Sequence, residues 1–381
     1  MALKAGHVSD NAALALSSAQ FFKGVNDHGG EEVKCGYEFS KFTVMGHRGC
    51  GMNMVQSSVR RMEFLKENSI LSFNAAAKLP IDFIEFDVQV TEDGCPVIFH
   101  DGFILTQEKG AIVEKRVTDL TVAEFLSYGP QKELGSVGKP LFRRTKDGKI
   151  FEWKVENDDP LCTLQEAFEK VENSVGFNIE LKLDDQVAYT EEQLTRVLQP
   201  ILQVVNECAK NRPIIFSSFQ PDAALLIRKL QTTYPVFFLT NGGSKIYIDI
   251  RRNSLDEAIK VCLRGGLQGI VSEVRGIFRN PGAVTRIKDS KLSLVTYGQL
   301  NNVPEVVYVQ HLNGVDGVIV DLVEEVTEAI SDWIRPAEDR EEDKNSFLGE
   351  EGQMQVKTKP GFLHQQQLSL PLKLPPELLR T

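Results

Sequence analysis

Two carboxylates and a histidine stand in one short segment, residues 81–101, where their spacing would bring them together. The segment holds two alternating apolar runs on either side of Asp93-Gly94, and a two-residue Asp-Gly loop is a strong β-hairpin signal. Such a hairpin places Asp87 opposite His100, with Cβ atoms roughly 5 Å apart. Glu85 precedes Asp87 by two residues and so lies on the same strand face. The hairpin therefore predicts two carboxylates and an imidazole on one surface.

The neighbours of Glu85 and Asp87 indicate that both carboxylates are buried. They are apolar: Ile84, Phe86, Val88, Val97 and Phe99. An unpaired charge in such a strand costs several kcal/mol, so a cation is expected nearby. The alternative, a solvent-facing hairpin with a surface charge pair, fits these neighbours less well.

Two further strand ends carry charged residues. The sequence NIELK places Glu180 and Lys182 on one face of the end of an apolar run, where the alternatives are a buried ion pair or a salt bridge at the rim. His47 and Arg48 follow the apolar run 43–45, and a tight surface turn is the alternative there.

The combination of these groups indicates a particular chemistry. Three carboxylates without sulfur favour a hard divalent cation such as Mg²⁺ or Ca²⁺ over zinc. Arg48 offers a planar fork for phosphate oxygens, and Lys182 offers a compact positive charge. With two histidines, the set indicates phosphoester cleavage.

Eight short apolar runs, most of them separated by helical patterns, must position these residues. The runs are 43–45, 83–88, 177–181, 214–216, 236–239, 269–271, 292–296 and 318–320. Thr163 with Glu166 is typical of a helix N-terminus, as is Ser254 with Glu257, and Gly265 is expected to end the second helix. Strands alternating with helices predict a parallel sheet, and eight of them suggest an α/β fold of the closed (β/α)8 TIM-barrel type. The alternative is a doubly wound open sheet.

The chain divides into three parts. Residues 1–41 are expected to be a poorly ordered lead and 336–381 a disordered tail, because neither has the pattern of a core. Residues 42–330 form the barrel, with 102–160 inserted after the second strand. Without that insertion the length is close to the ~250 residues typical of such barrels. All three sites then fall at the C-terminal ends of strands, where barrel enzymes carry their catalytic groups.

Composition excludes several classes of protein. The formal net charge of −10 disfavours nucleic-acid binding, and no apolar run approaches the ~18 residues of a membrane span. The six scattered cysteines indicate neither zinc nor a disulfide framework, so a reducing compartment is expected. The cytoplasm is the first choice. A plastid (chloroplast) stroma is the alternative, because Ala12–Ser18 is weakly similar to a transit peptide.

Several motifs resemble the glycerophosphodiester phosphodiesterase family. They are HRG at 47–49, KENSILSFNAAAK at 66–78, IEFDVQVTEDGCPVIFHD at 84–101 and NIELK at 178–182. SSFQPD at 217–222, VFFLTNGG and GLQGIVSEV resemble its plant branch. The resemblance covers about residues 42–330 and leaves out the lead and the tail.

The resemblance implies a metal-dependent hydrolase that cleaves glycerophosphocholine or glycerophosphoethanolamine into sn-glycerol 3-phosphate and an alcohol, in phospholipid breakdown and phosphate recovery. The family's acid/base pair corresponds to His47 and His100. Its metal ligands correspond to Glu85, Asp87 and Glu180, which would bind one divalent cation, Mg²⁺ or Ca²⁺. Its phosphate contacts correspond to Arg48 and Lys182. Phe219 matches a family aromatic residue, and Tyr297 stands where the family often has Trp beside the alcohol pocket. Glu67 and Asn68 match a turn that starts a helix and supports the site. The expected opposition to Asp87 favours a protonated His100 and hence His100 as the general acid.

Two rival functions remain. A related phospholipase that cleaves phosphatidylinositol or lysophospholipids needs an exposed apolar rim, for which Leu141-Phe142 among the basic residues Lys139, Arg143 and Arg144 is the only candidate. A catalytically silent phosphodiester-binding protein would keep the fold without turnover. Direct attack by water and initial attack by a glycerol hydroxyl, which would give a cyclic phosphate, are both open. So is the oligomeric state.

Overall fold

The computed structural model describes residues 37–133, 135–185, 187–331 and 333–334. Eight parallel strands pair in sequence order, and the last pairs with the first, so the sheet closes into a barrel. The strands are β1 (Thr43–His47), β2 (Phe83–Val90), β8 (Gly176–Leu181), β9 (Ile214–Ser218), β10 (Val236–Thr240), β11 (Gly269–Glu273), β12 (Ser293–Tyr297) and β13 (Gly317–Val320). Seven of them contain a whole predicted apolar run, and β12 contains the run 292–296 except for Leu292. The predicted (β/α)8 barrel is confirmed, and the open sheet is wrong.

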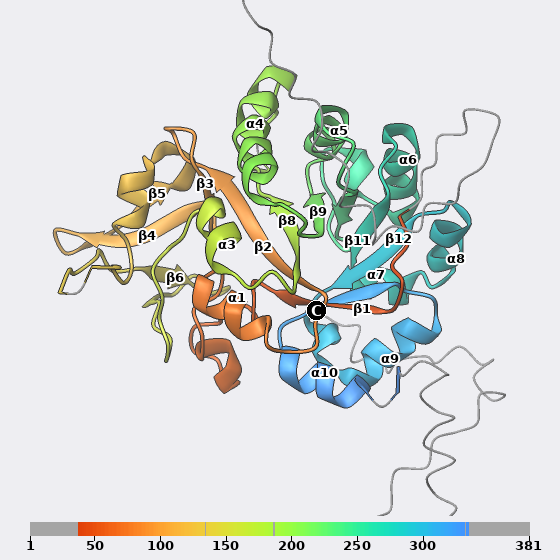
Figure 1. Cartoon of the computed structure of the whole chain (residues 1–381), viewed down its shortest axis with the longest axis horizontal. Helices are drawn as coiled ribbons and strands as arrows, with labels where there is room; N and C mark the ends of the chain where they lie inside the picture. The colour runs from red at the N-terminus through yellow and green to blue at the C-terminus, as the bar shows by residue number, and fades with distance from the viewer. Residues whose placement is uncertain (1–36, 134, 186, 332, 335–381) are drawn as a thin grey trace, which may run out of the picture.

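Helices surround the barrel (Figure 1) and bury their apolar faces against the strands. They are α1 (Ile70–Ala76), α3 (Leu164–Lys170), α4 (Glu191–Cys208), α5 (Pro221–Leu230), α6 (Leu255–Gly265), α7 (Val274–Arg279), α8 (Gly282–Asp289), α9 (Pro304–Leu312) and α10 (Val323–Ser331). Short 3₁₀ turns are η1 (Arg60–Glu63), η2 (Val117–Asp119), η3 (Ile250–Arg252) and η4 (Gln299–Asn302).

The predicted helix starts are correct, and one predicted helix end is displaced by a residue. Thr163 and Glu166 form both bonds of a capping box, and the Ser254 side chain accepts a hydrogen bond from the Glu257 backbone. Gly265 still belongs to its helix. The left-handed residue that ends it is Gly266, with φ +63°.

The barrel interior is apolar at one end. Side chains of alternate strand positions form a separate cluster there: Met45, Phe83, Ile215, Phe237, Leu239, Val271, Val295 and Ile319. The rings of Tyr37 and Phe39 lie 5.9 and 6.1 Å from that of Phe237 and cover the N-terminal end. Polar side chains are therefore left to the C-terminal strand ends.

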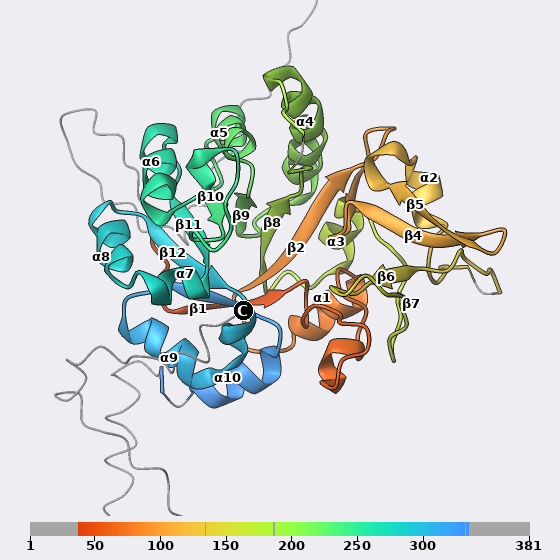
Figure 2. The ribbon, with the colours of Figure 1, turned by 180° about the vertical axis from the view of Figure 1, so that it is seen from behind.

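The inserted stretch is a small structure of its own that projects to one side of the barrel (Figures 1 and 2). After β3 (Pro96–Ile98) come β4 (Phe103–Glu108), β5 (Ala111–Arg116), α2 (Val122–Leu126), β6 (Phe142–Arg144) and β7 (Ile150–Glu152). Strands β4 to β7 form an antiparallel sheet in the order β5-β4-β6-β7. Phe99, Phe125, Tyr128 and Trp153 belong to a second apolar core beneath it.

The register of the β2–β3 hairpin corrects the sequence prediction. Val88 pairs with Ile98, one residue away from the predicted pairing, so Asp87 is not opposite His100. The loop has three residues, because Thr91 and Cys95 form the closing pair and Gly94 is left-handed at φ +81°. The Thr91 hydroxyl stabilises this loop by accepting from the Cys95 backbone N–H, with a 3.0 Å separation.

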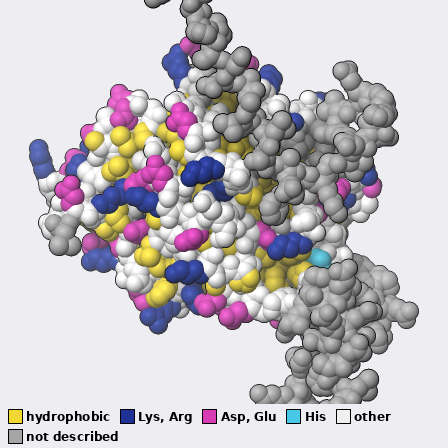
Figure 3. Space-filling view, viewed as in Figure 1, with side chains coloured by type: hydrophobic (Ala, Val, Ile, Leu, Met, Phe, Trp, Pro, Cys, Tyr) yellow, Lys and Arg dark blue, Asp and Glu magenta, His cyan; other side chains and the backbone are white. Residues whose placement is uncertain are grey.

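The surface carries charges of both signs. On the face seen in Figure 3, basic and acidic side chains are interspersed. Within the described residues, none of the helices combines the length and the apolar character that crossing a membrane requires.

Candidate active site

Three buried carboxylates meet at the C-terminal end of the barrel. Asp87 of β2 is in register with Glu180 of β8, and Glu85 lies two residues earlier on the same face as Asp87. One oxygen from each lies within 4.8 Å of the others. The structure thus brings together the three predicted metal ligands.

The electrostatics of this triad fit a bound cation. Burial and then the neighbouring Asp87 raise the pKa of Glu85 to about 8. Burial also acts to raise the pKa of Asp87, but His100, Lys182 and Arg48 outweigh it and the pKa is lowered. His47 and Arg48 thus compensate the charge of the buried Glu85 only in part. The triad could hold a metal ion, and its all-oxygen donors suit a hard divalent cation.

Arg48 lies in a tight turn directly after β1. It is left-handed at φ +49°, and so is Gly49 at φ +95°. A Cβ at Gly46 would lie 2.2 Å from the Gly49 carbonyl oxygen, so this turn requires glycine there. The turn aims the Arg48 backbone N–H at Glu85 Oε2, 3.2 Å away, and the guanidinium Nη1 at Glu67 Oε1, 2.9 Å away.

Each predicted catalytic histidine is held by an aspartate. The His47 Nδ1 lies 2.6 Å from Asp321 Oδ1, and the His100 Nδ1 lies 2.7 Å from Asp101 Oδ1. Burial lowers the pKa of His47, but Asp321 more than restores it, so the net shift is upward. Burial, Arg48 and Lys182 lower the pKa of His100 despite Asp87. Asp87 therefore favours the protonated imidazole as expected but is outweighed, and the role of His100 as the general acid stays a prediction.

Sequence reasoning missed Asp321, although a signal for it exists. It is the acidic residue that directly follows the last apolar run, 318–320, and strand ends gather at the site. Its carboxylate also accepts hydrogen bonds from the Met52 backbone and the Asn302 amide, both at 3.0 Å. These bonds fix the carboxylate that orients His47.

Lys182 stands among the carboxylates as predicted. Its Nζ lies 2.8 Å from Glu180 Oε1 and 3.5 Å from Asp87 Oδ1. Burial alone would lower the pKa of Lys182, but Glu180 and Asp87 raise it overall, so the ammonium stays charged.

The insertion supplies a residue that sequence reasoning placed elsewhere. Arg143 of β6 is buried, with Nη1 3.0 Å from Glu67 Oε2 and Nε 3.2 Å from Asp101 Oδ2. Burial would raise the pKa of Glu67, but Arg143 and Arg48 lower it to about 2. Arg143 thus connects the partner of His100 with the partner of Arg48. Nothing in the sequence pattern relates it to either.

Phe219 and Tyr297 meet at the barrel mouth. Their rings are perpendicular, with centroids 6.0 Å apart. Tyr297 ends β12, which lies across the barrel from β8, and its hydroxyl donates to Asn241 Oδ1 at 2.9 Å. Burial, Glu273 and Glu180 raise its pKa well above the usual value. The phenol therefore stays protonated and can act only as a hydrogen-bonding wall.

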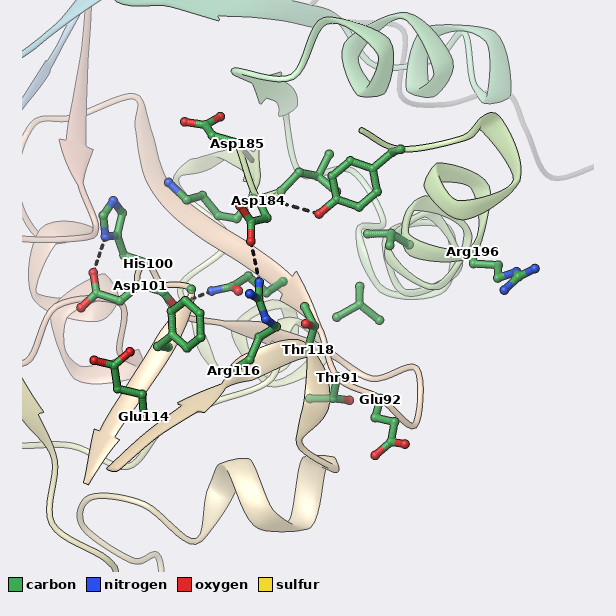
Figure 4. A pocket seen from close by; sticks show the side chains of 18 of the residues that line it. Thr91, Glu92, His100, Asp101, Glu114, Arg116, Thr118, Asp184, Asp185 and Arg196 are labelled. Atoms are coloured by element: carbon green, nitrogen blue, oxygen red, sulfur yellow. Dashed lines mark hydrogen bonds and ion pairs between the residues drawn. The ribbon is translucent and has the colours of Figure 1, made fainter. Parts of the chain in front are cut away.

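A cleft of about 840 Å³ opens beside the site, between the insertion and the loop after β8 (Figure 4). His100 and Lys182 line it. Arg116 of β5 donates to Asp184 Oδ2 at 2.5 Å and so joins the insertion to that loop. The cleft gives a substrate room beside two of the predicted site residues.

Comparison with known proteins agrees with this geometry. The model of the Glycerophosphoryl diester phosphodiesterase family matches residues 47–325. The chain is 63% identical over 342 residues to Glycerophosphodiester phosphodiesterase GDPD1, chloroplastic, of Arabidopsis thaliana, covering 90% of this chain and 91% of that protein. It is 67% identical over 293 residues to GDPD3 of the same plant, covering 77% and 79%.

Solved structures share the fold. A phosphodiesterase from Oleispira antarctica, in complex with the product sn-glycerol-3-phosphate, is similar with a TM-score of 0.54 and 18% identity, covering 76% of this chain and 97% of that one. A glycerophosphoryl diester phosphodiesterase from Silicibacter pomeroyi is similar with a TM-score of 0.57 and 20% identity, covering 78% and 95%.

Proposed function

Because the chain belongs to the glycerophosphoryl diester phosphodiesterase family, we propose that it hydrolyses glycerophosphodiesters such as glycerophosphocholine and glycerophosphoethanolamine. The products are sn-glycerol 3-phosphate and an alcohol, as in phospholipid breakdown and phosphate recovery. The observation that carries this proposal is the pair of aspartate-held histidines beside three buried carboxylates.

Glu85, Asp87 and Glu180 would hold one divalent cation, Mg²⁺ or Ca²⁺. When bound, such a cation neutralises developing negative charge and lowers the pKa of an attacking hydroxyl. The positive charges of Lys182 and Arg48 attract the phosphoryl oxygens of the substrate.

His47 and His100 move the protons. One removes the proton of the attacking group and the other protonates the departing alcohol, each contributing ~100- to 10,000-fold. Asp321 and Asp101 hold the two Nδ1 atoms, so that Nε2 of each ring is the atom left for proton transfer. Water and a glycerol hydroxyl remain alternative attacking groups. Phe219 and Tyr297 form the proposed wall for the organic part of the substrate.

The exposed apolar rim that a phospholipase would need is not formed by the residues predicted for it. Leu141 is buried under the insertion, Phe142 is half-buried, and Arg143 points into the site. Leu141-Phe142 is therefore not an exposed apolar rim. Relatives named glycerophosphocholine phosphodiesterases, such as the one from Candida albicans at 34% identity, support the water-soluble substrate.

Product identification tests the function. The full-length protein is incubated with glycerophosphocholine and Mg²⁺, and the phosphorus species are followed by ³¹P NMR. The account expects sn-glycerol 3-phosphate and choline, and loss of turnover in Glu180→Ala. Phosphocholine as the product would contradict it. Cleavage of lysophosphatidylcholine alone would favour the phospholipase, and no turnover of either would favour the silent binding protein.

The compartment stays a prediction, with the cytoplasm first. The relative GDPD1 is named chloroplastic, which supports the plastid alternative. Residues 1–36, where a transit signal would lie, are outside the described residues. A fluorescent protein fused to the C-terminus of the full chain distinguishes diffuse cytoplasmic from chloroplast fluorescence.

A further inference from the structure

The loop between β10 and α6, residues 241–254, exposes three isoleucines at alternate positions. Ile246, Ile248 and Ile250 are 80%, 104% and 69% exposed. Among the large apolar side chains that the structure describes, only Val137 is exposed to a similar degree, and the others stay below half. We call these three isoleucines the apolar tip.

The polarity of this loop is the reverse of that of an ordinary surface loop. The residues between the isoleucines face the protein: the Tyr247 hydroxyl accepts from Asn241 Nδ2 at 2.6 Å. Arg251 donates to both carboxylate oxygens of Asp222, at 2.6 and 2.9 Å, and also to Asp249. Polar bonds thus hold the loop in a shape that keeps its apolar side chains in water.

The apolar tip belongs to the same end of the barrel as the candidate active site. Asn241, which binds Tyr247, also binds Tyr297 at the barrel mouth. Arg252 stacks on the Tyr247 ring at 3.7 Å and pairs with Asp185 at 2.8 Å, in the loop that follows Lys182. A surface that bound the tip would therefore lie beside the entrance to the site.

We propose that the apolar tip inserts into a lipid surface and docks the barrel mouth on it. This goes beyond the proposed hydrolysis and does not depend on it. Aliphatic side chains that make no hydrogen bonds suit the acyl region of a bilayer. The three isoleucines offer only part of the ~800 Å² of surface that each partner buries in a stable protein interface. A second copy of the chain or another protein is therefore a less suitable partner.

The charge of the loop specifies the kind of lipid. Residues 241–254 hold three basic residues against one acidic residue, and because Arg251 and Arg252 pair with Asp222, Asp249 and Asp185, Lys245 is left to carry the positive charge. Lys245 is exposed next to Ile246, and it forms no ion pair with any residue that the structure describes. A lysine beside an inserted apolar group can extend to the headgroup level, so the expected surface is anionic.

Vesicle flotation tests the proposal with the full-length protein and no substrate. The wild-type protein should float with vesicles made of equal parts phosphatidylcholine and phosphatidylglycerol. A triple variant, I246S/I248S/I250S, should bind at least ~10-fold more weakly. The matched control V137S/L263S/L312S removes exposed aliphatic side chains elsewhere and should bind like wild type. Lys245→Glu should weaken binding about fivefold, and only on vesicles that contain phosphatidylglycerol.

Two control measurements test whether the triple variant keeps its activity and its oligomeric state. The triple variant should release glycerol 3-phosphate from dissolved glycerophosphocholine at the wild-type rate, because no tip residue touches the site. The molecular mass of the triple variant, measured by sedimentation, should equal that of the wild-type protein. The proposal is overturned if wild type stays off the vesicles, if the triple variant floats equally well, or if the triple variant loses a wild-type dimer. Absent turnover with intact flotation would refute only the proposed hydrolysis.

Discussion

The two histidines have matching hydrogen bonds but different electrostatic surroundings. Burial lowers the pKa of His47, but Asp321 and Glu85 raise it overall, whereas burial and the cations Arg48 and Lys182 lower the pKa of His100. The pair therefore meets a general requirement of acid–base catalysis, which is that two groups hold a proton with different strengths. Their roles should be separable by experiment.

The leaving group can separate these roles. An alkoxide such as that of choline departs poorly without a proton, whereas a nitrophenolate departs readily. Replacing the acid histidine by Ala should therefore abolish cleavage of glycerophosphocholine but spare much of the cleavage of a glycerophospho-nitrophenyl diester. Replacing the base should damage both. We expect one of the variants His47→Ala and His100→Ala to show each pattern. Equal losses on both substrates in both variants would contradict the division of labour.

The residues found from sequence share one property. His47, Glu180 and Lys182 stand at or just beyond the C-terminal ends of β1 and β8, and Glu85 and Asp87 lie within β2, in register with His47 and Glu180. Of the residues that act through those groups, Asp321 carries the same mark because it directly follows β13, whereas Arg143 carries none. Arg143 reaches the site only because the insertion folds back onto the barrel, a tertiary contact that no local pattern contains.

At the level of elements, the insertion supports the site. Strand β6 carries Arg143 under the site and Arg144 into solvent, because neighbouring residues of a strand face opposite sides. Arg143 binds the fully buried Glu67, whereas Arg144 pairs with the exposed Glu114. The two arginines form a matched pair for one experiment.

Arg143→Ala should destabilise the protein by about 3–5 kcal/mol, because it leaves the buried Glu67 carboxylate with one cation fewer. It should also lower turnover about tenfold or more through the loss of the Asp101 contact. Arg144→Ala should cost at most about 1 kcal/mol. It should lower turnover less than Arg143→Ala, because Arg144 lines the cleft but pairs with Glu114 and not with Glu67 or Asp101. Urea denaturation and glycerol 3-phosphate release measure both effects. Equal stability of the two variants would show that β6 does not support the site.

Element types were more predictable from sequence than their exact registers. The hairpin at Asp93-Gly94 exists, but the Thr91 hydroxyl bonds to Cys95 and the loop gains a residue. Gly265 and Gly266 are equally able to end α6, and helix geometry places the left-handed position on the second. A one-residue shift changes every pair of the β2–β3 ladder, and it decides which side chains face each other.

At the scale of the whole molecule, the ring of eight strands is complete before the tail begins. Strand β13 closes on β1, and α10 follows with buried Val323, Val326 and Ile330. Trp333 then lies 5.5 Å from the ring of Tyr308. The fold and the predicted site thus use residues before 335. The predicted tail at 336–381 and most of the predicted lead at 1–41 lie outside the described residues.

A chain ending at Arg335 should therefore fold and turn over glycerophosphocholine within about twofold of the full-length rate. A shorter chain ending at Asp316 lacks β13 and α10, and it should not fold because the barrel stays open. Circular dichroism and product release compare them. A large loss of rate in the first truncation would mean that the tail contributes to the site.

We propose that the three buried carboxylates hold the cation on which phosphodiester cleavage depends. The most direct measurement strips the enzyme with a chelator, removes the chelator by dialysis, and follows glycerol 3-phosphate release while Mg²⁺ or Ca²⁺ is added back. The account predicts no turnover in the stripped wild-type enzyme and saturable recovery. Glu180→Ala should need far more metal, whereas the control Glu328→Ala, at an exposed position of α10 away from the cleft, should respond like wild type. Full turnover by the stripped enzyme, or the same metal dependence for Glu180→Ala as for wild type, would contradict it.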